Sequence, residues 1–599
     1  MATRREAVHY RIAPLDPALH LFEVTLTIAS PAAEGQVVSL PAWIPGSYMV
    51  REFARNITSM RAEASGRKVR LTKLDKHSWR AARCEGPLIL TYQVYAWDLS
   101  VRAAHLDQTR GFFNGTSVFL QVHGKESLQH IVDIQPPEGD AFTGWRVATS
   151  LPELKARRHR FGTYIAQDYD ELIDHPVEMG DFELIRFEAH GVPHEMAVTG
   201  RVPNLDKARL ATDLKKICEY QIALFEPRTK KAPMDRYVFL TFAVGDGYGG
   251  LEHRASTALI CSRADLPVLG QSAMSEGYRT FLGLCSHEYF HTWNVKRIKP
   301  AVFAPYDLQQ ENYTTLLWLF EGFTSYYDDL TLLRTGLIDA PAYLGLLAKT
   351  VNGVLRGSGR HKQSVAESSF DAWTKYYRQD ENAPNAIVSY YTKGSLVALL
   401  FDLTIRHQTR GRKSLDDVMR VLWRRYGKSF YEGGDRGVTE AEVEALFDEV
   451  TGLHLKPTFD LAVRGTRDLP LQEMLAAFAV EMTDKTQGGK VSLDVRTKKT
   501  GNDCQLANVY EGGAAHAAGL SAGDTLVAMD SLRVTAANLE ILLQRYRAGD
   551  KVTLHAFRRD ELITFDLTLR AESAPQLVLT LKEKPVAALK LQRGWLKGR

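Results

Sequence analysis

The chain has 599 residues, which is too long for one hydrophobic core and predicts about three or four domains. Its hydrophobic fraction of 45% and charged fraction of 24% are those of a globular protein and exclude a disordered chain. The 75 basic and 71 acidic residues leave a formal charge of +4, and no basic stripe is interleaved with aromatic residues. Nucleic acid is therefore not an expected partner.

The start of the chain and its cysteines bear on the compartment. The opening MATRREAVHYRIAP lacks the apolar core of a signal peptide, and no later stretch reaches about 18 uninterrupted apolar residues. The five cysteines are few and scattered without a Cys-x-x-Cys pair, which fits reduced thiols: Cys84, Cys218, Cys261, Cys285 and Cys504. We expect a soluble cytoplasmic protein with no membrane partner, in which histidines and carboxylates would bind any zinc.

The first part of the chain, to about residue 170, is predicted to be β. Alternating apolar residues over 22–28 and 88–94 indicate strands with one buried face. Between them, PAWIPGSYMVREFARNI (41–57) contains two prolines and a glycine, which mark a turn between extended segments. From about residue 205 the pattern becomes helical, with an apolar strand over 237–244. The middle of the chain is therefore predicted to be mixed α/β and then mostly helical.

A second change of composition lies near residue 475. Short strands, the glycine-rich EGGAAHAAGLSAGD (511–524), a helix after Thr535 and a hairpin over 552–557 and 563–569 predict a small separate domain. The basic end of the chain, 590–599, is expected to be solvated rather than a binding arm.

The segment CSHEYFHTWN (285–294) places two histidines four residues apart around a glutamate. Helical spacing holds from Ser275 to Trp293 without proline, so His287 and His291 should lie one turn apart on one face, where both can reach one ion. Glu288 can hold a water molecule there, which is the general-base role in His-Glu-x-x-His. About 0.03 chance matches are expected in such a chain, so the motif is specific, although two solvated helix residues are the alternative.

A catalytic zinc needs a third protein ligand and an open position for water. The segment LLWLFEGFTSYYDDLTLLRTG (316–336) has apolar residues at helical spacing and ends near Gly336, a suitable C-cap. Glu321 lies inside this apolar run, and a buried carboxylate is costly unless it is paired or bound to a metal. It is the candidate third ligand. Asp328, seven residues on, returns to about the same face and could accept the N–H of a ligand histidine, with Asp329 as the alternative.

Four motifs together resemble a known family. HEYFH (287–291) with WLFEGF (318–323) resembles the gluzincin metallopeptidases, in which two histidines and a downstream glutamate bind zinc. GGLEH (249–253) is similar to the glycine-rich exopeptidase motif of the aminopeptidase N relatives, and YTKG (391–394) to their Tyr-x-Lys-Gly. The closer resemblance is to the glycyl aminopeptidase family, because the 41–57 segment, HTWNVKRIKP and the long gap before Glu321 are similar to that family's.

This resemblance covers nearly the whole chain and implies a multidomain α+β fold. The implied parts are an N-terminal β-sheet domain (1–175), a thermolysin-like α/β zinc peptidase domain with a helical C-terminal part (176–474), a C-terminal PDZ-like domain (475–575) and a tail (576–599).

The resemblance also implies the activity, a zinc-dependent aminopeptidase that removes N-terminal residues, preferably Gly or Ala, from peptides. One Zn²⁺ per chain would be bound by His287, His291 and Glu321. Glu288 would take the proton of the attacking water, and Tyr391 would donate a hydrogen bond to the developing oxyanion. Tyr390 adjoins Tyr391, and either tyrosine could instead simply pack.

The substrate would be a peptide with a free N-terminus. The resemblance places Glu252 against the α-ammonium group, and Gly249 and Gly250 would let the substrate backbone approach the edge strand. The motif ends in His253, where aminopeptidase N has asparagine.

Two other functions remain open. One is an endopeptidase of the same clan, and the other is a PDZ adaptor with a vestigial peptidase domain. AAHAAGLSAGDTLVAMDSL resembles the PDZ signature, and a PDZ domain would bind a peptide or protein partner by strand addition. The usual Gly-Leu-Gly-Phe loop is not evident. Gln487 to Val491 is the nearest candidate, so a structural or dimerising domain is as consistent with the sequence.

Overall fold

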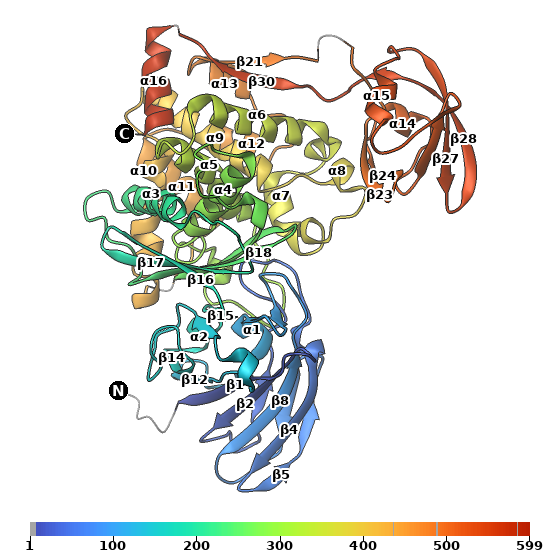
Figure 1. The fold of residues 1–599 in the computed structure, drawn as a ribbon. Helices are drawn as coiled ribbons and strands as arrows, with labels where there is room; N and C mark the ends of the chain where they lie inside the picture. Colours follow the sequence, from blue (N-terminus) through green and yellow to red (C-terminus); the bar gives the residue numbers. More distant parts are fainter. Residues whose placement is uncertain (1–6, 435, 487–488, 584, 599) are drawn as a thin grey trace. The chain divides into compact units, whose positions relative to one another are not determined.

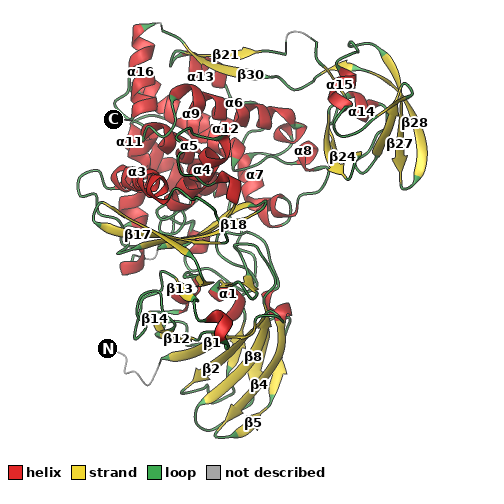
Figure 2. Ribbon diagram, viewed as in Figure 1, coloured by secondary structure: helices red, strands yellow, loops and turns green. Residues whose placement is uncertain are grey.

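The computed structural model describes residues 7–434, 436–486, 489–583 and 585–598. The chain divides into two units, one comprising Met1–Asn312 with Trp423–Gly437 and the other Tyr313–Leu422 with Val438–Arg599. Figures 1 and 2 show the elements of each unit. Among the described residues, no helix has the length and apolar character needed to cross a membrane.

The first unit begins with a β domain, coloured blue in Figure 1. The alternation predicted over 22–28 and 88–94 is confirmed, because β2 and β8 pair antiparallel with every second side chain buried and Leu26 opposite Leu90. Among the described strands of this sheet, β1 and β12 pair in parallel and the other neighbours pair antiparallel. Its strand order is β14 (Gly162–Ala166), β12 (His130–Ile134), β1 (Val8–Asp16), β2 (Leu21–Ile28), β8 (Leu88–Tyr95), β4 (Ile57–Ala64), β5 (Arg67–Val69).

Two smaller sheets and short helices accompany this sheet in the described part of the domain. The first sheet is β13 (Arg146–Ala148), β15 (Val177–Gly180), β10 (Arg110–Phe113), β9 (Ala104–Leu106), and the second is β11 (Gln121–Val122), β3 (Val37–Ser39), β7 (Ser78–Ala81), β6 (Leu71–Lys73). The helices are α1 (Gly115–Val118) and α2 (Tyr169–Ile173).

The segment 41–57 lies against residues 303–308 of the same unit. The indole N–H of Trp43 donates to the carbonyl oxygen of Asp307 (2.8 Å), and the N–H of Ala42 donates to that of Leu308 (2.8 Å). These bonds fix the predicted turn beside the part of the unit that carries the HEYFH helix.

A five-stranded mixed sheet follows in the first unit. The strand predicted over 237–244 is confirmed as β18, which pairs in parallel with both of its neighbours. The sheet order is β16 (Glu183–Ala189), β17 (Val192–Thr199), β18 (Tyr237–Val244), β20 (Ser256–Ser262), β19 (Tyr248–Glu252). The long helices α3 (Lys207–Phe225) and α4 (Glu276–Phe290) pack on it, with α4 against the edge strand β19.

The second unit is mostly helical. The helix predicted over 316–336 begins differently, because Trp318–Gly322 forms a π-helix before α5 (Phe323–Arg334), and Gly336 follows with φ 74°. Helix α9 (Thr392–Gln408) is buried along most of its length. The other described α-helices of this unit up to residue 476 are α6 (Ala340–Arg356), α7 (Val365–Phe370), α8 (Ala383–Ala386), α10 (Leu415–Leu422), α11 (Glu440–Thr451), α12 (Lys456–Ala462) and α13 (Leu471–Ala476).

The C-terminal part of the second unit has its own hydrophobic core, which includes Leu506, Leu526, Leu539 and Leu554. Its main sheet is β23 (Val495–Thr500), β24 (Asp503–Val509), β25 (Thr525–Met529), β27 (Lys551–Arg558), β28 (Glu561–Thr568), with β26 (Leu532–Arg533) on β25. Short helices α14 (Ala514–Ala517) and α15 (Leu539–Leu543) and the pairs β21 (Val480–Asp484) with β30 (Leu577–Leu581) and β22 (Val491–Ser492) with β29 (Arg570–Ala571) complete it. Gln487 and Gly488 of the candidate peptide-binding loop lie outside the described residues.

The basic side chains Lys590, Arg593 and Lys597 at the end of the chain are exposed, as predicted, but the helix that carries them was not predicted. Residues 586–597 form helix α16 (Val586–Lys597), in which Trp595 is fully buried. The indole N–H of Trp595 donates to the hydroxyl of Tyr326 (3.0 Å), and its carbonyl oxygen accepts from Arg334 (2.8 Å). The apolar residues at this end of the chain recur at helical spacing, so one face of the helix packs against the protein although the segment is basic.

Candidate active site

Helix α4 carries the predicted metal-binding motif in the first unit. The hydroxyl of Ser275 caps the helix by accepting a hydrogen bond from the backbone of the first turn (3.1 Å). The helix packs its apolar residues into the unit, which buries Glu288 and His291 and leaves His287 half-buried. The sequence therefore presents the motif at the boundary between the core and solvent.

The two histidines point at one common place. Their Nε2 atoms are 3.1 Å apart, and the rings stand nearly perpendicular with centroids 4.8 Å apart. Nδ1 of His291 lies 2.8 Å from the carbonyl oxygen of Asn294, which requires the proton on Nδ1. The lone pair of His291 is therefore on Nε2 and faces His287, which suits a shared cation.

The turn after the helix is strained at Val295. This β-branched residue has φ 110°, a conformation that costs about 1–3 kcal/mol. Its N–H donates to the carbonyl oxygen of Ile298 (2.9 Å), which closes the turn. The strained residue directly follows Asn294, so the turn holds the carbonyl group that orients His291.

Two carboxylates lie beside His291. Glu252, Glu288 and His291 each offer an oxygen or nitrogen within 4.8 Å of those of the other two, and all three are buried. Gly250 on β19 makes room for this group, since a methyl group there would lie 2.6 Å from Cγ of Glu288. The Arg102 guanidinium donates to the carbonyl oxygen of Gly250 (3.3 Å).

A loop of the N-terminal β domain reaches the same group. Gly46 has φ 96°, and a methyl group on it would lie 2.6–2.8 Å from both carboxylate oxygens of Glu252. Aromatic residues pack together in the segments that follow Gly46 and α4 in the chain. The ring of Tyr48 stacks on Phe303 with centroids 5.8 Å apart, and the charge of Glu252 adds to the effect of burial in raising the pKa of Tyr306.

Glu321 lies in the second unit, inside the π-helix Trp318–Gly322. Its exposed fraction is 2%. Burial raises the pKa of Tyr376 and of Tyr390, and the charge of Glu321 adds to both shifts. π-helical turns are frequent at functional sites. Gly322, next in the chain, allows Gly394 of α9 to approach, because a methyl group on Gly322 would lie 2.6 Å from the backbone of Gly394.

Tyr391 precedes α9 and is half-buried, whereas Tyr390 is fully buried. The Tyr391 ring stacks on Tyr390 with centroids 4.7 Å apart and on Tyr376 at 5.5 Å. Its hydroxyl lies 3.3 Å from that of Tyr377. Of the adjacent tyrosines, Tyr391 is the one with access to solvent. The sequence did not indicate Tyr376 and Tyr377, because neither belongs to a motif.

Asp328 and Asp329 are both half-buried on α5. The N–H of Asp329 donates to the carboxylate of Asp328 (2.5 Å). Their relation to a ligand histidine stays a prediction.

The family follows from two kinds of comparison. The family model of the Peptidase M61 N-terminal domain matches residues 9–181, and that of M61 glycyl aminopeptidase matches residues 280–397. A crystal structure of an aminopeptidase N family protein from Idiomarina loihiensis is 42% identical with a TM-score of 0.93, over 98% of this chain and 100% of that one. The chain belongs to the M61 glycyl aminopeptidase family. It is a metallopeptidase, as the sequence predicts.

Two further solved structures are more distant from this M61 peptidase. An M1 zinc metallopeptidase from Deinococcus radiodurans is 15% identical with a TM-score of 0.47, over 78% of this chain and 95% of that one. Legionella pneumophila aminopeptidase A, in complex with aspartic acid, is 13% identical with a TM-score of 0.48, over 98% of this chain and 60% of that one. A structural similarity of this extent does not establish a shared function. No curated protein matches the chain.

The M61 peptidase departs from the aminopeptidase N motif at His253, and the structure explains what this residue contacts. Its Nδ1 lies 3.1 Å from the carboxylate of Asp174, a residue of the N-terminal β domain, and its side chain is 1% exposed. His253 therefore points into the protein. Asp174, Asn294 and Gly46 were not predicted as site residues, although Gly46 belongs to the 41–57 segment that resembles the family's.

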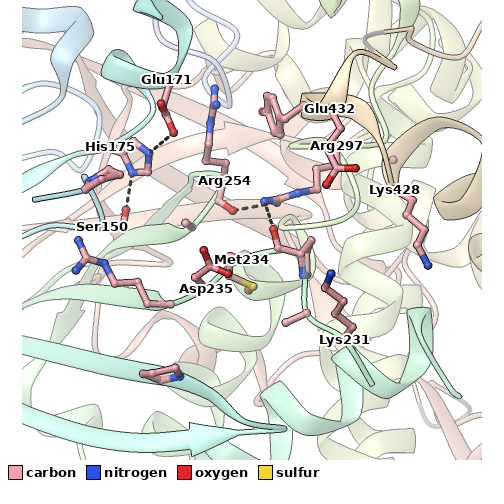
Figure 3. Close-up of a pocket in the computed structure, with 18 of the residues that line it drawn as sticks. Ser150, Glu171, His175, Lys231, Met234, Asp235, Arg254, Arg297, Lys428 and Glu432 are labelled. Carbon is pink, nitrogen blue, oxygen red and sulfur yellow. Dashed lines mark hydrogen bonds and ion pairs between the residues drawn. The ribbon is translucent and has the colours of Figure 1, made fainter. Parts of the chain in front are cut away.

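A cavity of about 690 Å³ lies next to this part of the first unit (Figure 3). Its charged lining residues are mostly paired. Arg236 bonds Glu153 (2.6 Å), and Arg297 donates to the carbonyl oxygens of Arg254 and Pro233 (2.9 and 2.8 Å).

Proposed function

We propose that this M61 peptidase is a zinc-dependent aminopeptidase. The observation that carries the proposal is the grouping of Glu252, Glu288 and His291 within 4.8 Å of one another. Within an amino acid, the α-nitrogen and the carbonyl carbon are about 2.5 Å apart, and the next residue lies ~3.8 Å further along the chain. An α-ammonium held at Glu252 therefore presents the first peptide bond to Glu288. This grouping supports cleavage at the N-terminus over endopeptidase activity.

The proposed metal ligands are His287, His291 and Glu321. Two imidazoles and one carboxylate are a ligand set of catalytic zinc sites. The convergence of the histidine Nε2 atoms, 3.1 Å apart, fits such a group, and so does the burial of the Glu321 carboxylate among apolar residues. Asp328 or Asp329 is proposed to accept the N–H of a ligand histidine. When bound, zinc lowers the pKa of a water molecule and polarises the scissile carbonyl group.

The chain's own residues then handle protons and charge. Glu288 accepts the proton of the attacking water and passes it to the leaving amine. Tyr391, which is half-buried, donates a hydrogen bond to the negative charge that develops on the carbonyl oxygen. Glu252 pairs with the α-ammonium, and its burial strengthens that pairing because the effective dielectric constant is low.

Small N-terminal residues such as Gly and Ala are the proposed substrates. The backbone of Gly46 lies directly against the Glu252 carboxylate, and Tyr48, two residues further on, stacks on Phe303, which contacts Tyr306. Large substrate side chains would compete with these groups for space. A library of aminoacyl anilides tests this point, and equal rates for glycyl and phenylalanyl substrates would contradict it.

The C-terminal domain is proposed to bind an extended peptide as a PDZ-like module. Among the described strands β23 pairs with β24 alone, so its other edge is the candidate for strand addition. Titration of C-terminal peptides checks this. Tight peptide binding by a protein with neither zinc nor peptidase activity would instead favour the adaptor alternative.

The decisive experiment combines metal content with one substitution. We expect about one zinc per chain in the purified enzyme, loss of aminoacyl anilide hydrolysis on chelation, and recovery on adding zinc. Glu288→Gln should retain zinc and lower kcat at least ~100-fold. An enzyme that lacks zinc yet is active, or a variant that retains wild-type rates, would contradict the proposal.

A further inference from the structure

Asp174 is a buried carboxylate that the proposed chemistry does not use. It ends helix α2, within the segment that matches the M61 N-terminal domain, and its side chain is 9% exposed. A buried charge is costly unless several partners compensate it. The partners of Asp174 all come from segments that flank the proposed active site.

One oxygen of Asp174 bonds two side chains. Its Oδ1 accepts from Nζ of Lys296 (2.7 Å) and from Nδ1 of His253 (3.1 Å), and both of these side chains are buried. Because the acceptor is a carboxylate, the His253 proton is on Nδ1. Nε2 of His253 has no hydrogen-bond partner in the part of the chain that the structure describes.

The other oxygen bonds one residue twice. Oδ2 of Asp174 accepts from the backbone N–H of Arg254 (3.2 Å) and from its Nε (3.0 Å). Burial alone would raise the pKa of Asp174, but Lys296, His253 and Arg254 hold it well below its usual range. The carboxylate is therefore ionised at neutral pH and carries four charge-assisted or backbone hydrogen bonds.

These bonds connect two segments that must keep a fixed distance. His253 and Arg254 directly follow Glu252, the proposed anchor for the α-ammonium, at the end of β19. Lys296 follows the strained Val295 in the turn that orients His291. One carboxylate from the N-terminal β domain thus ties the anchor strand to the end of the metal-binding helix.

We infer that Asp174 is a positioning residue for the amine anchor, which sets where Glu252 lies relative to His287 and His291. This inference rests on the proposed aminopeptidase function. It also gives the N-terminal β domain a part in substrate recognition, since Asp174 and Gly46 fix the anchor from two sides. A general structural ion pair would stabilise the fold without affecting the recognition of the ammonium group specifically.

Two hydroxamates that differ only in an amino group separate these roles. Glycine hydroxamate carries the α-amino group, and acetohydroxamate lacks it. For the wild-type enzyme we expect glycine hydroxamate to inhibit at least about tenfold more strongly. For Asp174→Asn that preference should fall to about twofold or less, with acetohydroxamate inhibition and zinc content unchanged and KM for glycyl anilide raised more than kcat is lowered.

Asp170→Asn is the matched control. Asp170 bonds the same Arg254 at Nη2 (2.5 Å), but its side chain is 47% exposed and it bonds neither His253 nor Lys296 in the described structure. This variant should keep the wild-type preference between the hydroxamates. If Asp170→Asn loses the preference for glycine hydroxamate as Asp174→Asn does, the loss is caused by the disturbed Arg254 and the inference about Asp174 is wrong.

A double variant covers the case in which Asp174→Asn does not fold, because that change leaves the Lys296 ammonium buried beside a neutral group. Asp174→Asn with Lys296→Met removes both charges and should still lack the preference. An intact preference in either folded variant, or equal loss of both hydroxamates, would overturn the inference. A wild-type enzyme that binds both hydroxamates equally would contradict the amine anchor itself, and an enzyme that binds neither would contradict the proposed function.

Discussion

Replacing Gly250 by alanine tests whether the position of Glu288 controls catalysis. The added methyl group would lie 2.6 Å from Cγ of Glu288 and closer still to its carboxylate. Carbon atoms in contact are about 3.5–4.0 Å apart, so the side chain has to move by about 1 Å. A displacement of that size can lower a rate ~100-fold, and we expect such a loss in kcat. Gly250 pairs with Leu259 in a regular ladder, so the sheet should tolerate alanine.

Gly249→Ala is the matched control on the neighbouring position of β19. A methyl group on Gly249 would lie 3.5 Å from Ile260 and 3.8 Å from Arg102, which are ordinary contacts. We expect its kcat at saturating substrate to stay within about threefold of wild type, with any larger change confined to KM, because Gly249 is a candidate contact of the substrate backbone. The assay is glycyl anilide hydrolysis at saturating substrate, with zinc content and melting temperature measured for each variant. A Gly250→Ala enzyme with wild-type kcat would refute the reasoning, and a loss explained by missing zinc would refute it equally.

Three further changes test other parts of the account. Tyr391→Phe should lower kcat about 100-fold with little change in KM. Tyr377→Phe should lower kcat less than about tenfold. Equal losses of kcat in the two variants would contradict the assignment of Tyr391 as the oxyanion donor. Gly322→Ala should destabilise the second unit by about 1–3 kcal/mol, because the methyl group would lie 2.6 Å from the backbone of Gly394, and an unchanged melting temperature would argue against this close packing. Burial lowers the pKa of His130 from 6.5 to about 4. Between pH 6.5 and pH 4, the unfolded chain therefore binds a proton at His130 that the folded chain does not bind. The free energy of unfolding falls as the pH falls through this range. At pH 5 the contribution of His130 lowers the free energy of unfolding by about 2 kcal/mol. Denaturant unfolding measured at pH 7 and pH 5 should therefore show a smaller change in the free energy of unfolding for His130→Gln than for wild type.

The strands of the N-terminal β domain and the two histidines of the candidate site were predictable from local sequence patterns. The alternation over 22–28 and 88–94 predicted paired strands, and helical spacing placed His287 and His291 on one face, because both properties depend on neighbours in the chain. The local pattern failed where packing overrides it. The charged end of the chain forms a helix around buried Trp595, and Glu321 lies in a π-helix rather than an α-helix.

The contacts that hold the candidate site in place were not predictable from local sequence. Asp174 bonds His253 across 79 positions of sequence, and no motif marks it. Gly46 contacts Glu252 from another domain, so its role depends on tertiary packing. The strain at Val295 appears only in the backbone angles, since nothing about a valine between Asn294 and Lys296 predicts a positive φ.

The most direct test of the account is hydrolysis of paired peptides by the zinc-loaded enzyme, one with a free N-terminal glycine and one with the same glycine acetylated. If Glu252 anchors the α-ammonium beside Glu288, acetylation should lower kcat/KM by at least about 1,000-fold, because it removes the positive charge that the buried Glu252 carboxylate would bind. Equal cleavage of the two peptides would contradict the aminopeptidase assignment and favour an endopeptidase.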